Sequence, residues 1–97
     1  MELKLKVITP NGIFLNSIKV SHVGVQTTDG DMTIYARHAA IVSTLKIGLV
    51  KYTDVKGNIK YIHVHRGILQ VHNNEVKVLT PWLYEVDEKG KKLGPKI

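Results

Sequence analysis

Apolar residues alternate with polar or charged ones along most of the chain, and this period of two constrains the fold more than any other feature. Near the start, Leu3, Leu5 and Val7 alternate with charged residues, which gives one apolar and one charged face and is typical of a half-buried β-strand. No segment before Thr80 carries apolar residues at spacings of three and four over ten or more positions, and β-branched residues dominate the apolar set. The pattern therefore predicts an all-β domain.

Turn residues separate the alternating runs. Residues 10–12 read Pro-Asn-Gly, a combination that favours a reversal of the chain. Residues 54–58 and 73–74 are expected to be hairpin turns, because glycine and asparagine tolerate positive φ. The run from residue 13 to residue 26 changes its phase of alternation midway, which predicts a bulge or bend near Ser21 and His22.

Length and strand number together predict the architecture. The 97 residues are enough for one domain with a modest core. Eight or more short strands cannot hide their apolar faces in a single sheet, so we expect a β-sandwich over residues 1–80. The strand pattern stops at Pro81, and residues 81–97 are expected to form a short, basic, flexible tail with little structure beyond Tyr84. Its basic character comes from Lys89, Lys91, Lys92 and Lys96.

A formal net charge of +6 raises nucleic acid as a partner, because clustered Lys and Arg release counterions from phosphates. Most of the lysines are spread along the predicted strands, which disfavours this alternative. In the nucleic-acid alternative, a basic β-domain would bind RNA or DNA with Tyr52 and Tyr61 as stacking platforms. The chain contains no cysteine, as is typical of a reducing compartment, and no apolar run long enough for a membrane span.

The sequence shows no catalytic or cofactor site. It has no Ser or Cys nucleophile with an obvious base and no phosphate loop of the GxxxxGK type. His63 and His65 lie on one face of a predicted strand, and His72 could join them from the neighbouring strand, but a carboxylate or third ligand fixed by local spacing is lacking. We therefore expect no metal, no nucleotide and no cofactor.

Three blocks of sequence carry a family resemblance. They are residues 7–14, residues 27–48 with a turn, a histidine and a closing glycine, and residues 66–79 with a glycine, a strand, a polar turn and another strand. These blocks resemble the epsilon subunit of the rotary F-type ATP synthase, and the resemblance covers nearly all of residues 2–80. It implies a flattened β-sandwich of about ten strands. Most family members continue with two antiparallel helices, for which these 97 residues leave no room, so a short form without the C-terminal helical hairpin is expected.

The resemblance implies a function without chemistry of its own. A subunit of this kind is part of the central stalk, or rotor, and docks on the gamma subunit and on the c-ring. It reaches the alpha3beta3 assembly through gamma, and it couples proton or other ion transport to ATP synthesis and hydrolysis. The implied location is the cytoplasmic face of the cell membrane, where the subunit is peripheral and associates with the membrane only through the c-ring.

The resemblance also implies three contact residues. Asp31 follows the turn glycine where family members commonly carry Glu, an acid that approaches the basic polar loops of the c-ring. His38 matches a family histidine in a loop close to gamma, and Arg37 adds a positive charge there that suits an acidic partner residue. Family members commonly have proline on both sides of this histidine, whereas this chain has Ala36 and Ala40, so we expect a less rigid loop.

Two alternatives stay open from the sequence. The first is an epsilon-like subunit of a modified F1-like ATPase motor that uses a gamma-like partner without proton transport. The lost prolines and the missing helices support this alternative. The second is the basic β-domain that binds nucleic acid.

Overall fold

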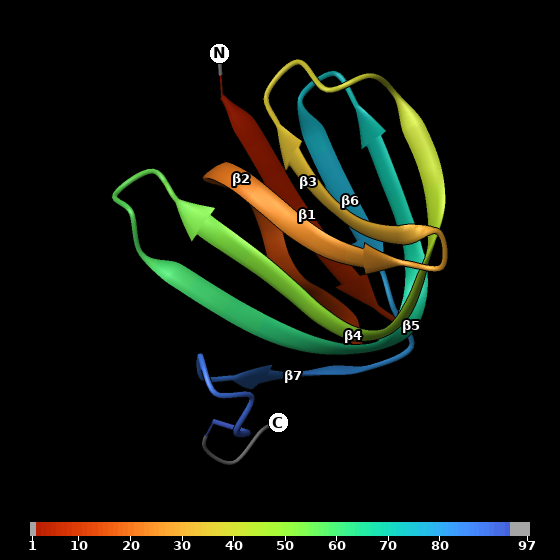
Figure 1. The fold of residues 1–97 in the computed structure, drawn as a ribbon, viewed down its shortest axis with the longest axis vertical. Helices are drawn as coiled ribbons and strands as arrows, with labels where there is room; N and C mark the ends of the chain where they lie inside the picture. Colours follow the sequence, from red (N-terminus) through yellow and green to blue (C-terminus); the bar gives the residue numbers. More distant parts are fainter. Residues whose placement is uncertain (1, 94–97) are drawn as a thin grey trace.

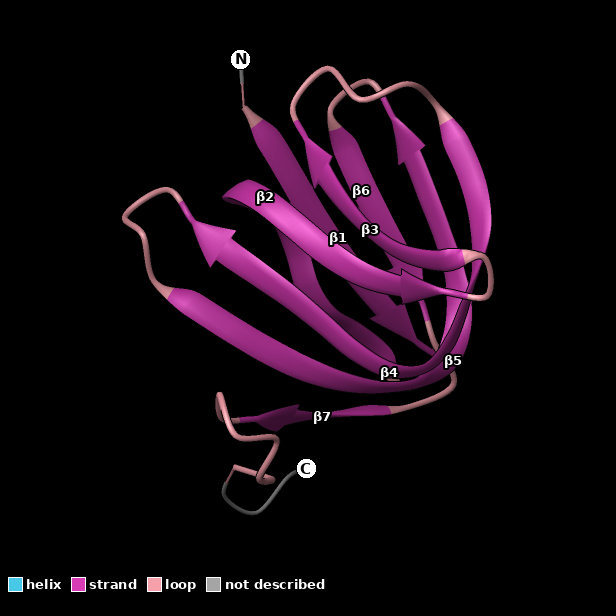
Figure 2. Ribbon diagram, in the orientation of Figure 1, coloured by secondary structure: helices cyan, strands magenta, loops and turns pink. Residues whose placement is uncertain are grey.

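The computed structural model describes residues 2–93, and these contain seven β-strands and no helix (Figures 1 and 2). The strands are β1 (Leu3–Thr9), β2 (Gly12–Thr27), β3 (Gly30–Tyr35), β4 (Ile41–Asp54), β5 (Ile59–His72), β6 (Glu75–Leu79) and β7 (Leu83–Val86). The prediction of an all-β fold is confirmed. Lys96 of the predicted basic tail lies outside the described residues.

The strands form one sheet that folds over on itself. Their order is β1-β6-β5-β4-β2-β3, β1 also pairs with β2, and β7 pairs with β5. The β1–β6 pair is parallel and the other pairs are antiparallel. In Figure 1, β1 and β6 lie behind β2 and β3, so the sheet makes two layers whose inner faces pack together, and the predicted β-sandwich is confirmed.

The described strands are fewer than the expected ten or so because three of them are long. β2 has 16 residues, and β4 and β5 have 14 each, so each continues from one layer into the other where a shorter strand would end. A register shift in the β2–β4 pairing between Val20 and His22 shows how β2 bends. It confirms the bulge predicted near Ser21 and His22.

The core lies between the two layers and is built from the apolar half of the alternating pattern. Each fully buried aliphatic side chain stabilises the fold by about 1.5–3 kcal/mol relative to an exposed one. The largest fully buried side chains, each exposed by 2% or less, are those of Leu3, Leu5, Ile34, Leu45, Ile62, Leu69, Val7, Val20, Val23, Val50, Val64 and Val71.

The turns follow the local chemistry that the sequence predicted. Gly12, Gly30 and Gly57 have φ angles of 131°, 123° and 92°, and Asn73 and Asn74 have φ angles of 50° and 62°. Consecutive positive φ angles at both central positions of the β5–β6 hairpin are those of a type I′ turn.

A kink divides β5 into two halves at Arg66 and Gly67, whose φ angles are 64° and 155°. A Cβ atom on Gly67 would collide with the backbone carbonyl oxygen of Leu79, so this position requires glycine. The Thr80 hydroxyl donates a hydrogen bond of 2.6 Å to the Arg66 carbonyl oxygen. The kink is therefore fastened to the point where the chain leaves β6.

The prediction that the strand pattern ends at Pro81 was wrong. β7 pairs with residues 61–64 of β5, with Tyr84 opposite His63 and Leu83 opposite Val64. β6 pairs only with the second half of β5, so one backbone edge of the first half of β5 is left without β6 as a partner. β7 pairs with this edge and satisfies its hydrogen-bonding groups. The division of the chain at residue 80 and the flexibility of the tail stay predictions.

Candidate functional site: docking surfaces

Asp31 stands at the beginning of β3 with its side chain exposed. The turn before it is tightened by Thr27, whose hydroxyl donates to the Gly30 carbonyl oxygen (2.6 Å) and accepts from the Asp29 backbone N–H (3.1 Å). Asp31 lies opposite Gln26 in the β2–β3 pair. A short, internally bonded turn thus presents an exposed carboxylate on a rigid strand, as an electrostatic contact requires.

Arg37 and His38 lie in the loop of residues 36–40 that joins β3 to β4. Arg37 is exposed and has a φ angle of 68°, while His38 is half-buried. The His38 backbone N–H donates to the Tyr35 carbonyl oxygen (3.3 Å), and its ring Nδ1–H donates to the Ala39 carbonyl oxygen (2.8 Å). These bonds fold the loop locally, although residues 36–40 contain no proline.

Asn74 anchors this loop from a distant part of the chain. Its side-chain Oδ1 accepts a hydrogen bond of 2.5 Å from the Arg37 backbone N–H, and its carbonyl oxygen accepts one of 2.9 Å from the Lys4 backbone N–H. In Figure 1 the loop after β3 and the β5–β6 turn lie side by side at the top of the molecule. Sequence reasoning identified Asn74 only as a turn residue and missed this contact, because a separation of 37 residues leaves no local signal.

The structure does not bring Asp31 and His38 into one site. Asp31 is the second residue of β3 and His38 lies in the loop after that strand. The four residue steps from Asp31 to Tyr35 alone span roughly 13 Å at the usual rise per strand residue. The turn that carries Asp31 and the loop that carries His38 lie at opposite ends of β3 (Figure 1). This arrangement suits contacts with two different partners.

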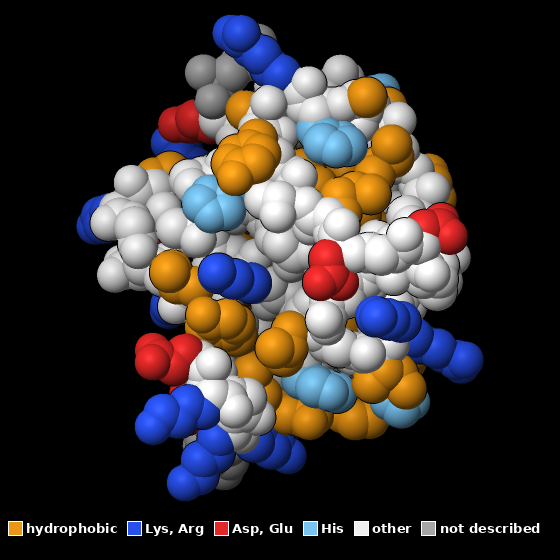
Figure 3. Space-filling view, in the orientation of Figure 1, with side chains coloured by type: hydrophobic (Ala, Val, Ile, Leu, Met, Phe, Trp, Pro, Cys, Tyr) orange, Lys and Arg blue, Asp and Glu red, His pale blue; other side chains and the backbone are white. Residues whose placement is uncertain are grey.

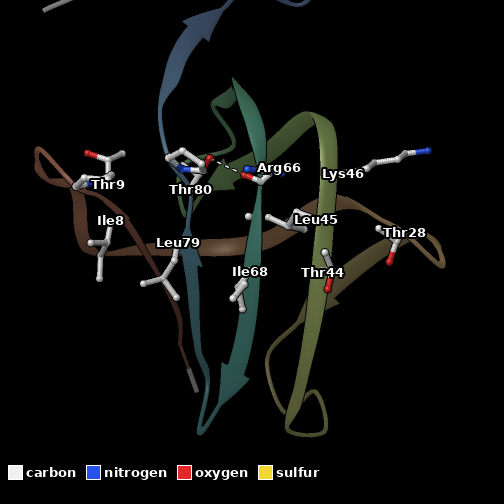
Figure 4. Close-up of a pocket in the computed structure, with 13 residues that line it drawn as sticks. Ile8, Thr9, Thr28, Thr44, Leu45, Lys46, Arg66, Ile68, Leu79 and Thr80 are labelled. Carbon is white, nitrogen blue, oxygen red and sulfur yellow. Dashed lines mark hydrogen bonds between the residues drawn. The ribbon is translucent and has the colours of Figure 1, made fainter.

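An apolar groove of about 820 Å³ lies on the outer face of the sheet beside the β5 kink (Figure 4). Ile8, Leu79, Ile68 and Thr44 form a row across four neighbouring strands, since each is paired with the next in register. In Figure 4, Ile8, Leu79 and Ile68 point away from their strands in the same direction. Sequence reasoning missed the groove, because the register that aligns β1, β6, β5 and β4 is set by long-range pairing.

His63 and His65 share one face of β5, as predicted, but each stacks on an aromatic ring of the tail. The His63 and Tyr84 ring centroids are 4.8 Å apart at 11°, and those of His65 and Trp82 are 4.8 Å apart at 19°. His72 lies at the far end of β5. Across residues 2–93 no three His, Cys, Asp or Glu side chains are grouped so that they could hold a metal ion.

Tyr52 cannot serve as the stacking platform that the nucleic-acid alternative expected. Its side chain is 4% exposed, and burial, with smaller contributions from the charges of Glu85 and Asp54, raises the pKa of its hydroxyl to about 12. In the view of Figure 3, Lys and Arg side chains are scattered over the surface, with a group at the lower left near the tail. No helix in the described part of the chain is long and apolar enough to cross a bilayer.

The fold defines a class: a small β-sandwich domain, here with exposed side chains at the two ends of β3 and an apolar groove on its outer face. Residues 2–84 match the family described as the ATP synthase, Delta/Epsilon chain, beta-sandwich domain. The chain belongs to this family.

Curated relatives support the assignment. The chain is 32% identical over 90 residues to the ATP synthase epsilon chain of Pelagibacter ubique, covering 93% of this chain and 68% of that one. It is 34% identical over 87 residues to the epsilon chain of Thermodesulfovibrio yellowstonii, covering 90% of this chain and 61% of that one. It is also 32% identical over 78 residues to the epsilon chain of Macrococcus caseolyticus, of which it covers 57%. This chain thus spans about three-fifths to two-thirds of the length of these relatives.

Solved structures share the fold. A chain in the cryo-EM structure of the Euglena gracilis mitochondrial ATP synthase, which contains OSCP, F1 and the c-ring, aligns with a TM-score of 0.83 at 18% identity, covering 91% of this chain and 57% of that one. A chain in the central stalk and c-ring of the Tetrahymena thermophila mitochondrial ATP synthase aligns with a TM-score of 0.74 at 19% identity, covering 87% and 66%.

Proposed function

We propose that this chain is a central-stalk subunit of an F-type ATP synthase that docks on the gamma subunit and on the c-ring. Through gamma it acts on the alpha3beta3 assembly, and it couples ion translocation to ATP synthesis and hydrolysis. The observation that carries the proposal is family membership over residues 2–84. Its place is the cytoplasmic face of the cell membrane, where the c-ring holds it as a peripheral subunit.

The contribution of this chain to coupling is stiffness. Its sheet is closed by the β1–β2 pairing, and the long strands β2, β4 and β5 run from one layer into the other, so twisting one layer against the other would break backbone hydrogen bonds. The accessible surface is 6009 Å². A standard interface takes roughly 800 Å² from each partner, which leaves ample room for two partners at once.

The contact with the c-ring and the contact with gamma lie at opposite ends of β3. Asp31 lies toward the basic polar loops of the c-ring, where an exposed carboxylate is electrostatically favourable. His38 and Arg37 lie toward gamma, on a loop held to the sandwich through Asn74.

A charge reversal at Asp31 tests this division, and Asp29 supplies a matched control because both carboxylates are exposed and belong to the same turn. We expect Asp31→Lys to weaken binding to purified c-ring at least about tenfold, since one attractive charge pair becomes repulsive. Binding to purified gamma should be unchanged, and Asp29→Lys should weaken c-ring binding less. His38→Ala with Arg37→Glu should show the reverse selectivity. Equal effects of the two aspartate variants on the c-ring would refute the assignment of Asp31.

A further inference from the structure

The pairing of β2 with β4 is interrupted close to the turn that carries Asp31. The regular pairs on either side of the gap are Gly24 with Lys51 and Thr27 with Leu45. Between these pairs the stretch of β4 is longer than the stretch of β2, so the regular ladder of backbone hydrogen bonds cannot continue through it. Polar backbone groups of β4 in this gap need another partner, because an unpaired group in a folded sheet is costly.

The side chain of Gln26 supplies such a partner across the gap. Its Oε1 accepts a hydrogen bond of 2.7 Å from the Leu49 backbone N–H, and this Gln26–Leu49 bond is partly buried. Gly48 leaves the space for it, because a Cβ atom at Gly48 would collide with Gln26 Oε1. Gly48 is not among the glycines with positive φ, so its backbone conformation does not require glycine. The closing glycine of the second sequence block therefore has a steric role toward Gln26.

The Gln26–Leu49 bond lies directly beside Asp31. Gln26 and Asp31 are opposite each other in the β2–β3 pair, and residues opposite each other in a sheet project to the same face. At the other side of the gap, the Thr28 backbone N–H donates to the Thr44 carbonyl oxygen at 2.9 Å, and in Figure 1 the β2–β3 turn lies against the bend of β4. The turn is thus bonded to β4 at two separated points, which together fix its orientation.

We propose that Gln26 is a positioning residue for Asp31. Its bond to Leu49, made in the space that Gly48 leaves, holds the β2–β3 turn in a fixed orientation to β4, so that the Asp31 carboxylate meets the basic loops of the c-ring already ordered. A contact that is ordered before binding loses less conformational entropy when it forms. The inference rests on the proposed contact of Asp31 with the c-ring and adds the residue that keeps this contact rigid.

Gln26→Ala tests the bond in the isotopically labelled chain by NMR. We expect the backbone amide hydrogen of Leu49 to exchange with solvent up to roughly tenfold faster, and ¹⁵N relaxation to show greater mobility at the Asp31 amide. Gln70→Ala is the matched control, because Gln70 is the other glutamine of the chain and lies exposed on β5. It should change neither quantity. Unchanged exchange at Leu49 or unchanged mobility at Asp31 in Gln26→Ala would overturn the proposal.

Gly48→Ala breaks the same bond from the other side and leaves Gln26 in place. The added methyl group should push the Gln26 amide away from Leu49, so the Leu49 amide should exchange faster, as it does in Gln26→Ala. The double variant should exchange no faster than the faster single variant, because both substitutions remove one and the same bond. Additive effects would give the two residues separate structural roles and would contradict the proposal. Thermal unfolding checks that all variants fold.

Binding to purified c-ring separates positioning of Asp31 from a general structural effect. Gln26→Ala should weaken binding of the chain roughly threefold to tenfold, and it should have no further effect in an Asp31→Asn background. An equal effect in both backgrounds would show that Gln26 acts independently of Asp31 and would overturn this inference alone. If Asp31→Asn itself leaves c-ring binding unchanged, the proposed c-ring contact fails and this inference fails with it, even where Gln26→Ala speeds exchange at Leu49.

Discussion

Replacing Asn74 by glycine should loosen the loop that carries Arg37 and His38. Asn74 Oδ1 accepts the Arg37 backbone N–H at 2.5 Å, and this bond ties the loop to the β5–β6 hairpin. Glycine tolerates the φ angle of 62° at this position, so the substitution removes the side chain without adding backbone strain. Asn73→Gly is the matched control, because Asn73 occupies the preceding position of the same turn with a φ angle of 50°.

The expected magnitude follows from the loss of one side chain to backbone hydrogen bond. Such a bond contributes about 0.5–1.5 kcal/mol net to the free energy of unfolding. Asn74→Gly should therefore lower that free energy by about 1 kcal/mol, while Asn73→Gly, at an exposed position, should change it by less than about 0.5 kcal/mol. The backbone amide hydrogen of Arg37 should also exchange with solvent faster in Asn74→Gly, by up to roughly tenfold.

Urea unfolding and amide hydrogen exchange measure the two effects separately. If the proposed gamma contact is correct, Asn74→Gly should also weaken binding to gamma, because the loop must be reordered before it docks. Binding to the c-ring should be unaffected. Unchanged exchange at Arg37 in Asn74→Gly, or equal destabilisation by the two glycine variants, would refute the anchoring role of Asn74.

Two further predictions concern the sandwich itself. Burial raises the pKa of Tyr52 from its ordinary value of 10.0 to about 12 in the folded chain. The folded state therefore binds this proton more tightly than the unfolded state, and the resulting stability is fully present below pH 10 and is lost as the pH rises toward 12. Alkaline unfolding should show a loss on the order of 2 kcal/mol over this window that Tyr52→Phe removes, and an identical pH profile for both proteins would contradict the shift. Gly67→Ala should destabilise by roughly 2–3 kcal/mol in urea unfolding because its Cβ meets the Leu79 carbonyl. Gly57→Ala, which has positive φ but nothing within 4 Å, should cost only roughly 1 kcal/mol, and equal costs would argue against a steric role for Gly67.

Features set by neighbours in the sequence could be predicted. The positive φ angles of Gly57, Asn73 and Asn74 follow from turn chemistry, and the irregularity at His22 follows from a change in the phase of alternation. The burial of Leu3, Leu5, Val7 and their counterparts follows from the period of two. These signals depend on a few adjacent residues, which a single sequence contains in full.

Features set by long-range pairing could not be predicted. The parallel β1–β6 pairing joins the first strand to one about seventy residues later, and it determines that Ile8 and Leu79 meet in the groove. The tail segment from Trp82 to Val86 carries too few residues for a strand pattern, yet the free edge of β5 and the histidines on its face give it a place to pair and stack. For the docking surfaces, the exposed positions of Asp31 and Arg37 could be predicted, whereas the anchor at Asn74 could not.

The most direct test of the proposed function is to tag this chain in its native cell, solubilise the membranes gently and identify the proteins that purify with it. The account predicts that alpha, beta and gamma subunits and the c-ring are recovered together, in amounts that fit one copy of this chain per complex. Recovery of F1-like subunits without a c-ring, recovery of nucleic acid, or recovery of the tagged chain alone would contradict it.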